Sequence, residues 1–222
     1  MKKSEFPEKA YEVFANHELL SMGYMLYIPS QLKEQRLGYD ALLHLKNRRI
    51  KAVALQYKIV SEYERAPKLF SKRCFKFELH KSSTGEYLQH NIMVKKNTRS
   101  WPPISAFYCV PCFVEYKVLY KHLQNGVVLK NSCFLKPSSE INDSKYHYVK
   151  FDSNQACQFS DDPKPMEIHS LDSLFEQQES VLFEDIMRES CVDEKHLICK
   201  IDEYLLQSQS FLLIKLSNEN SV

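Results

Sequence analysis

The first apolar pattern along the chain has the period of a helix. Over residues 7–22, non-charged side chains recur every three or four positions, which predicts a helix with a buried stripe formed by Ala10, Val13, Phe14, His17 and Leu20. Pro7 suits the first turn of this helix and Gly23 suits the position just after its end. Glu18 lies four residues after Phe14, so we expect it at the edge of the stripe. Residues 24–28 then predict a short strand that Pro29 closes.

The next pattern predicts two strands joined by a tight turn. Residues 38–46 and 50–60 are rich in apolar and β-branched side chains, and the polar residues 47–49 lie between them. A three-residue turn would pair Lys46 with Ile50 and bring Asp40 opposite Gln56, whereas a two-residue turn would bring Asp40 opposite Leu55. Both registers leave the backbones of Asp40 and Gln56 within a residue of each other.

The remaining pattern predicts more strands and then helices. Strands are expected at residues 73–79, 86–94, 104–114, 127–135 and 146–151, and a short helix at 115–123. Residues 152–169 contain Ser-Asp-Asp-Pro-Lys-Pro and are typical of a linker, and residues 170–189 and 193–209 have helical periodicity. We therefore expect an α/β protein with a central mixed β-sheet flanked by helices. Residues 1–151 would form this domain, 152–169 a linker, and 170–222 an acidic helical C-terminal appendage.

Charge is divided unevenly between these parts. Residues 1–150 contain 25 Lys and Arg against 13 Asp and Glu, a net +12, whereas residues 151–222 contain 5 against 15, a net −10. A basic domain of this size favours binding to a polyanion, with DNA as the expected partner. The acidic segment could dock on the basic domain, bind a protein partner, mediate self-association or simply complete the core. An accidental segregation of surface charge is the alternative to all of these.

Other features of the sequence indicate a soluble cytoplasmic protein. No apolar region follows the N-terminal lysines, so we expect no signal peptide, and no apolar run reaches the roughly 18 residues of a membrane span. The seven cysteines are then expected to be free thiols. Cys109 and Cys112 have the spacing of a zinc half-site or a redox pair, but their apolar strand favours a packing role instead.

One group of residues could carry catalysis. Asp40, Gln56 and Lys58 can cluster in the predicted hairpin, and the helix that carries Glu18 can pack over the same strands. A hard divalent ion such as Mg²⁺ or Mn²⁺ takes oxygen ligands, here from Asp40, Gln56 and Glu18. The ion would polarise a phosphodiester and activate a water molecule. Lys58 would orient that water and neutralise charge on the phosphorus.

This arrangement resembles the PD-(D/E)xK nuclease superfamily, in particular its QxK variant in restriction endonucleases that act on modified DNA. The resemblance covers residues 12–60 and rests on Glu18, on Asp40 in Gly38-Tyr39-Asp40, and on Gln56-Tyr57-Lys58. It implies a restriction-endonuclease-like fold, Mg²⁺ dependence and cleavage of DNA, with restriction or anti-phage defence as the setting. Tyr39 stands where the motif has proline, and Gln56 is uncharged, so metal binding would depend more on Glu18.

Each residue of this group also has a structural interpretation. Asp40 could cap a strand, Lys58 could extend from a strand edge, and Glu18 could be an ordinary helix residue. A non-catalytic nucleic-acid-binding module, or a protein-interaction module that retains a nuclease-like fold, is therefore the alternative to a nuclease.

Overall fold

The structure, a computed structural model, describes residues 1–27, 41–47, 49–63, 70, 73–82, 85–99, 104–160, 163–175 and 181–182. These residues form three α-helices, α1 (Glu8–Ser21), α3 (Leu88–Arg99) and α4 (Tyr116–Gln124). Two single turns of 3-10 helix are also present, η1 (Leu129–Asn131) and η2 (Asp172–Phe175). None of the helices in the described ranges is long and apolar enough to cross a membrane.

The strands form one curled sheet. They are β1 (Lys2–Lys3), β2 (Met25–Tyr27), β3 (Ala41–Asn47), β4 (Arg49–Tyr57), β5 (Ser61–Tyr63), β6 (Cys74–Glu78), β7 (Ile104–Pro111), β8 (Ser132–Lys136), β9 (Tyr148–Phe151), β10 (Ala156–Phe159), β11 (Lys164–His169) and β12 (Val181–Leu182). Their order is β1-β5-β6-β9-β10-β11-β8-β7-β4-β3-β2, with β12 paired to β4. β4 and β7 run parallel, and the neighbours of each, β3 and β8, are antiparallel to them.

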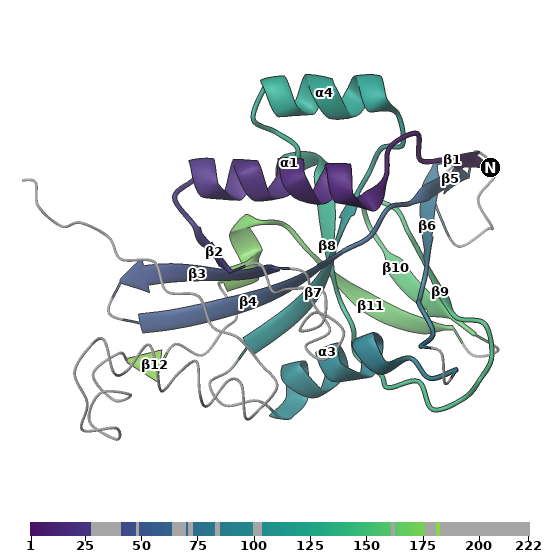
Figure 1. The fold of residues 1–222 in the computed structure, drawn as a ribbon. Coiled ribbons are helices and arrows are strands. Elements are labelled where there is room, and N and C mark those ends of the chain that lie inside the picture. The colour runs from purple at the N-terminus through teal and green to yellow at the C-terminus, as the bar shows by residue number, and fades with distance from the viewer. Residues whose placement is uncertain are drawn as a thin grey trace, which may run out of the picture.

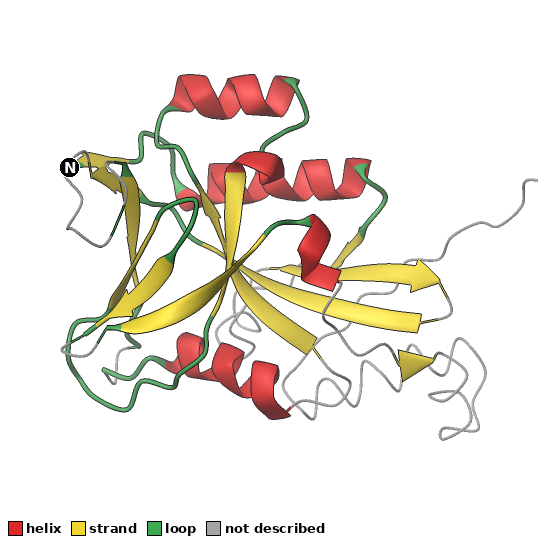
Figure 2. Cartoon of the chain, turned by 180° about the vertical axis from the view of Figure 1, so that it is seen from behind, coloured by secondary structure: helices red, strands yellow, loops and turns green. Residues whose placement is uncertain are grey.

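Helices cover both faces of the central strands. Figure 1 shows α1 and α4 on one side of β4, β7 and β8 and α3 on the other, and Figure 2 shows the same layers from behind. The expected α/β class with a mixed sheet flanked by helices is therefore confirmed.

The parallel pair β4 and β7 requires a crossover, because parallel strands cannot be joined by a tight turn. After β4 the chain forms β5 and β6 and returns through α3 to begin β7. The Asn97 side chain at the end of α3 holds this return. Its Nδ2 donates to Ala106 O at 3.1 Å, and Ala106 N donates to its Oδ1 at 2.7 Å. The Asn97 side chain thus supplies hydrogen-bond partners for β7 at Ala106, beyond the end of the β7–β8 ladder.

Alternation along β4 divides the core in two. Val53, Leu55 and Tyr57 belong to the apolar cluster that includes Tyr11 and Leu19 of α1. Ala54 belongs to a second cluster, which lies between the curled half of the sheet and α3 and contains residues such as Phe77, Met93 and Phe151. Successive residues of one strand therefore face different helices.

The β3–β4 hairpin has the register of the three-residue turn. Lys46 pairs with Ile50, and the ladder extends to Ala41 opposite Leu55. Asp40 precedes Ala41 in the sequence and lies outside the described residues.

The predicted buried stripe of α1 is wrong at Val13, His17 and Leu20, whereas Ala10 and Phe14 do pack against the core and the ends of the helix are close to those expected. The helix follows Pro7 and ends at the cap Met22, and Gly23 adopts a positive φ of 80°. Its buried residues are Tyr11, Glu12, Ala15, Asn16, Glu18 and Leu19, whereas Val13 and Leu20 are 50% and 55% exposed. Buried polar partners cause the difference: Tyr57 Oη donates to Asn16 Oδ1 at 2.6 Å, and Tyr11 Oη donates to Ser132 Oγ at 2.7 Å. These hydrogen bonds allow polar side chains on the inner face.

The strand predicted at residues 86–94 is also wrong, because α3 occupies most of this segment. Tyr87, His90, Met93 and Val94 are buried, and their spacing of three and four residues is helical. The helical period was missed because residues such as His90 are polar, and the sequence does not show that they are buried with hydrogen-bond partners.

The predicted linker at residues 152–169 does not hold either. β10 and β11 lie within it, and β11 pairs with β8, so these strands join the two halves of the sheet. In the segment expected to begin a helical appendage, the described residues form η2 and β12. Leu174 of η2 is buried in the cluster under α1. Residues 183–222, with the second predicted helix, lie outside the described part of the chain.

Candidate functional site

The carboxyl end of β4 holds an ion pair that joins the sheet to α1. Lys58 Nζ lies 3.3 Å from Glu8 Oε1, and Ile59 N donates to Glu8 Oε2 at 3.4 Å. The Lys58 side chain is only 12% exposed, while that of Glu8 is 39% exposed. Lys58 N also donates to Cys109 O at 3.2 Å, which carries the β4–β7 ladder one residue further. A nearly buried ammonium group is thus held in place beside a carboxylate that solvent reaches.

Glu8 is a site residue that the sequence analysis missed. It is the first residue of α1 and follows Pro7, which takes φ −73° and ψ 156° at the N-cap. An acidic side chain in the first turn is favoured by the helix dipole. Because the helix dipole already explains an acidic residue at this position, the sequence gives no sign that Glu8 also pairs with Lys58. The distance of 3.3 Å between Glu8 Oε1 and Lys58 Nζ is the observation that identifies Glu8 as a site residue.

Gln56 lies two residues before Lys58 and is 1% exposed. Its neighbours on the same face, Ala54 and its ladder partner Tyr108, belong to the cluster on the α3 side. Tyr57, between Gln56 and Lys58, faces α1 instead. Gln56 therefore points away from α1, whereas the Lys58 side chain reaches the first turn of α1.

Glu18 has a different role from the one expected. It is 4% exposed, and its Oε2 accepts hydrogen bonds from Val128 N at 2.6 Å and Leu129 N at 3.3 Å. The carboxylate thus caps the start of η1. Ten residues separate Glu8 from Glu18, a rise of about 15 Å along the helix. Glu18 therefore lies at the opposite end of α1 from the residue that contacts Lys58.

The oxygen donors at the end of β4 suit a hard cation in their chemistry. Glu8 offers a carboxylate and Gln56 an amide, which are the donor types that Mg²⁺ and Mn²⁺ prefer, but Gln56 points away from α1 and so does not share a site with Glu8. Asp40, the third donor expected here, lies outside the described residues. Within the described part of the chain, no three His, Cys, Asp or Glu side chains form a metal-binding group.

The cysteines at 109 and 112 do not pair with each other. Cys109 Sγ lies 3.2 Å from Tyr11 Oη, and Cys112 Sγ lies 3.3 Å from Cys133 Sγ. The hydrogen bond to Cys133, with burial, raises the pKa of the Cys112 thiol. Cys74, Cys109, Cys112, Cys133 and Cys157 are all free, as expected for the described cysteines. Cys109 belongs to the cluster under α1, whereas Cys112 packs against the cluster on the α3 side.

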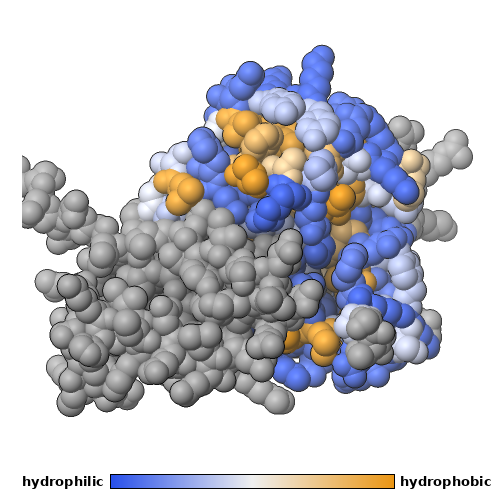
Figure 3. Space-filling model, viewed as in Figure 1, coloured by the Kyte–Doolittle hydropathy of each residue, from blue (hydrophilic) through white to orange (hydrophobic). Residues whose placement is uncertain are grey.

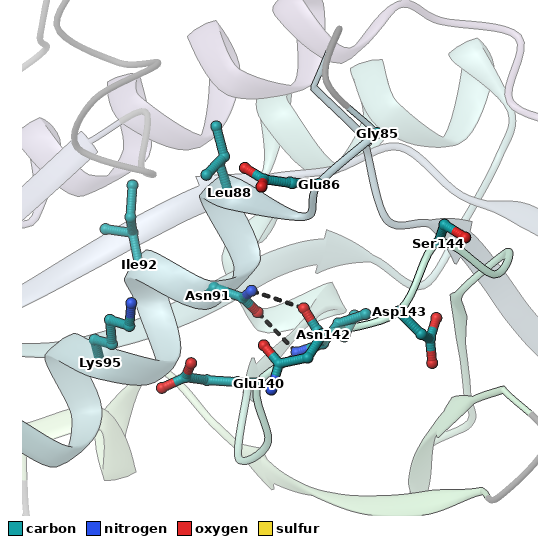
Figure 4. A pocket seen from close by; sticks show the side chains of 11 residues that line it. Gly85, Glu86, Leu88, Asn91, Ile92, Lys95, Glu140, Asn142, Asp143 and Ser144 are labelled. Carbon is teal, nitrogen blue, oxygen red and sulfur yellow. Dashed lines mark hydrogen bonds between the residues drawn. The ribbon is translucent and has the colours of Figure 1, made fainter.

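An open pocket of about 450 Å³ lies between α3 and residues 140–144 (Figure 4). The Asn91 amide exchanges two hydrogen bonds of 2.8 Å with the Ile141 backbone, shown as dashed lines. Glu86, Lys95 and Glu140 are among the other lining residues. The polar centre of this pocket serves to hold the loop against α3.

The exposed apolar side chains of α1 are visible on the surface. Figure 3 shows apolar groups where α1 and α4 reach solvent, and Val13 and Leu20 are among the large apolar residues that are exposed. They lie on the face of α1 opposite the core.

Comparison with known proteins identifies no relative: no protein-family model, no curated protein and no solved structure matches this chain.

Proposed function

We propose that this chain is a metal-dependent nuclease that hydrolyses phosphodiester bonds in DNA and has a restriction-endonuclease-like core. The observation that carries the proposal is the ion pair between Lys58 and Glu8 at the end of β4. The order α1, β2, β3 and β4 supports it, because the PD-(D/E)xK resemblance calls for a helix, a strand, an Asp strand and a QxK strand in this order.

Each residue of the proposed site has a role that follows from its chemistry. Lys58 orients the attacking water and neutralises charge on the phosphorus. Asp40 and Glu8 would hold Mg²⁺ or Mn²⁺, with Glu8 in place of Glu18, whereas Gln56 points away from α1 and takes no part in this metal site. When bound, the metal polarises the phosphate and lowers the pKa of a coordinated water. The expected setting is restriction or anti-phage defence in the cytoplasm.

Cleavage of plasmid DNA with Mg²⁺ or Mn²⁺ tests the site. Lys58→Ala and Asp40→Ala should abolish cleavage, and Glu8→Gln should lower its rate by at least about tenfold, the scale of a lost metal-site or acid–base contact. Lys9→Ala is the matched control, because Lys9 lies beside Glu8 in α1 and its exposed ammonium pairs with Glu12.

Glu18→Gln separates the two glutamates. It should lower the melting temperature, since it weakens the cap of η1, while cleavage per folded molecule stays unchanged. A Lys58→Ala protein that cuts at the wild-type rate would rule out this site.

A non-catalytic DNA-binding module is the second candidate. The burial of Gln56 on the α3 side favours it, because the metal site then lacks one of the oxygen ligands that the resemblance implies. A protein that binds DNA but leaves it intact with either metal, both as wild type and as Gln56→Glu, would establish this alternative.

A further inference from the structure

The curled half of the sheet carries aromatic rings and lysines on its outer side. Phe75, Phe77 and Phe151 face inward into the core between this half and α3. The residues that alternate with them, or lie at the strand ends, form what we call the aromatic–lysine face: Tyr63, Lys76, Tyr146, Tyr148, Lys150 and Phe159. They come from β5, β6, β9 and β10 and from the residues just before β9 (Figure 1).

Two lysines lie directly opposite each other at the centre of this face. Lys76 of β6 and Lys150 of β9 are Cα partners in an antiparallel ladder. Like charges in this position destabilise a sheet. Glu78 lies 3.8 Å from Lys76, but its side chain is 63% exposed, so it offsets the repulsion only weakly. The pairing of these two strands by itself therefore disfavours two lysines at this position.

Aromatic rings surround both ammonium groups. Lys76 Nζ lies 4.4 Å from the ring centroid of Tyr148 and 5.0 Å from that of Tyr146. Lys150 Nζ lies between 5.4 and 5.6 Å from the rings of Tyr63, Tyr148 and Phe159. Such contacts attract a cation to the ring face and hold it in place. The two charges are thus positioned side by side instead of spreading apart into solvent.

Rings are also available to stack on a ligand. The rings of Tyr148 and Phe159 are stacked at 5.3 Å with 5° between their planes, and the Tyr146 ring lies 5.6 Å from that of Tyr148. Tyr146 is 51% exposed, so part of its ring remains accessible at the end of this row. The face combines a site for an anion with a surface for a planar group.

We propose that the aromatic–lysine face binds single-stranded DNA, with a phosphate between Lys76 and Lys150 and a base stacked on Tyr146. A bound phosphate offsets the repulsion between the two lysines, so phosphate binding accounts for their position opposite each other. Stacking requires an unpaired base, so duplex DNA would use this face poorly. This binding is independent of the proposed catalytic site, which lies at the end of β4.

Fluorescence anisotropy with a labelled oligo(dT) of about 16 nucleotides tests the proposal, with EDTA present so that no cleavage occurs. The double variant Lys76→Gln/Lys150→Gln should bind at least about tenfold more weakly. Its salt dependence should fall by about 0.7 in the slope of log affinity against log salt, because one neutralised phosphate is lost. Its thermal unfolding should remain cooperative, which would show that the weaker binding is not a loss of the fold.

Two further sets of variants test whether DNA binding depends on the aromatic–lysine face. Tyr146→Ala should weaken binding about fivefold or more, and Tyr146→Phe, which keeps the ring, should bind as the wild type does. Lys117→Gln/Lys121→Gln makes the same change of charge on exposed residues of α4 and should leave the affinity nearly unchanged.

Wild-type affinity in the Lys76/Lys150 variant, an equal loss in the α4 variant, or an unchanged Tyr146→Ala protein would each overturn this proposal. None of these results would affect the nuclease proposal, because cleavage is measured separately with Lys58 and Glu8 variants. Loss of cleavage in those variants, in turn, would leave the binding result untouched.

Discussion

Individual buried polar residues connect α3 to the rest of the fold, and His90 is the one with a pH-dependent consequence. His90 is 2% exposed, and its ring nitrogens lie 2.9 Å from Tyr108 Oη and from Ser139 O. Burial lowers the pKa of His90 to about 4, below its ordinary value of 6.5. The folded protein therefore keeps this ring neutral where the unfolded chain would protonate it.

Stability should consequently fall as the pH is lowered through this range. The unfolded chain binds more protons below pH 6.5, so the contribution of His90 is present above 6.5 and is lost progressively toward pH 4. Between pH 7 and pH 5 the loss should be about 2 kcal/mol. Urea unfolding at both pH values measures it. His90→Gln should remove most of this difference, whereas His17→Gln, at an exposed position of α1, should not.

At the scale of an element, α1 shows how one helix selects its buried face. Leu19 is fully buried in the cluster with Val53 and Tyr57, whereas its neighbour Leu20 is 55% exposed. The two leucines are therefore a matched pair that differs only in the face each one occupies. Leu19→Ala should cost about 2–5 kcal/mol of unfolding free energy through lost burial and a residual cavity. Leu20→Ala should change it by no more than about 0.5 kcal/mol.

Chemical denaturation of both variants decides which face of α1 is buried. Equal losses for Leu19→Ala and Leu20→Ala, or a larger loss for Leu20→Ala, would restore the stripe that apolar spacing alone predicts.

At the scale of the whole molecule, the acidic third of the sequence does not begin where the sheet ends. Residues 151–182 include β10, β11, η2 and β12, and β11 lies between β10 and β8 in the sheet. Three acidic residues, Asp152, Glu167 and Asp172, lie in the described part of this segment, so acidic residues of the last third already belong to the body. The change in net charge along the sequence therefore does not mark a boundary between domains.

Two truncations test this boundary. Deletion of residues 152–222 removes β10 and β11 and should prevent cooperative unfolding, because the sheet is then divided. Deletion of residues 183–222 should leave a protein that unfolds cooperatively, as measured by circular dichroism during heating. Cooperative unfolding of the protein that lacks residues 152–222 would contradict this boundary. A rise in DNA affinity on deletion of 183–222 would support restraint of DNA binding by this acidic segment.

Local signals in the sequence determined several elements correctly. The polar residues 47–49 between two apolar runs predicted the β3–β4 hairpin and limited it to two registers, of which the structure adopts that of the three-residue turn. The apolar run at 104–114 specified β7. Asn125-Gly126 marked the end of α4, where Gly126 takes φ 61°. In each case the information lies within a few neighbouring residues.

Tertiary structure alone decided the rest, because it depends on partners far away in the sequence. Asn97 and His90 belong to a helix only once Ala106, Tyr108 and Ser139 provide their hydrogen bonds. The sequence indicated Glu18 as the glutamate of this site, whereas the packing of α1 brings Glu8 to Lys58 instead. Lys76 and Lys150 are 74 residues apart, yet the curl of the sheet makes them neighbours. Periodicity specifies which side chains share a face, whereas chain topology specifies which faces meet.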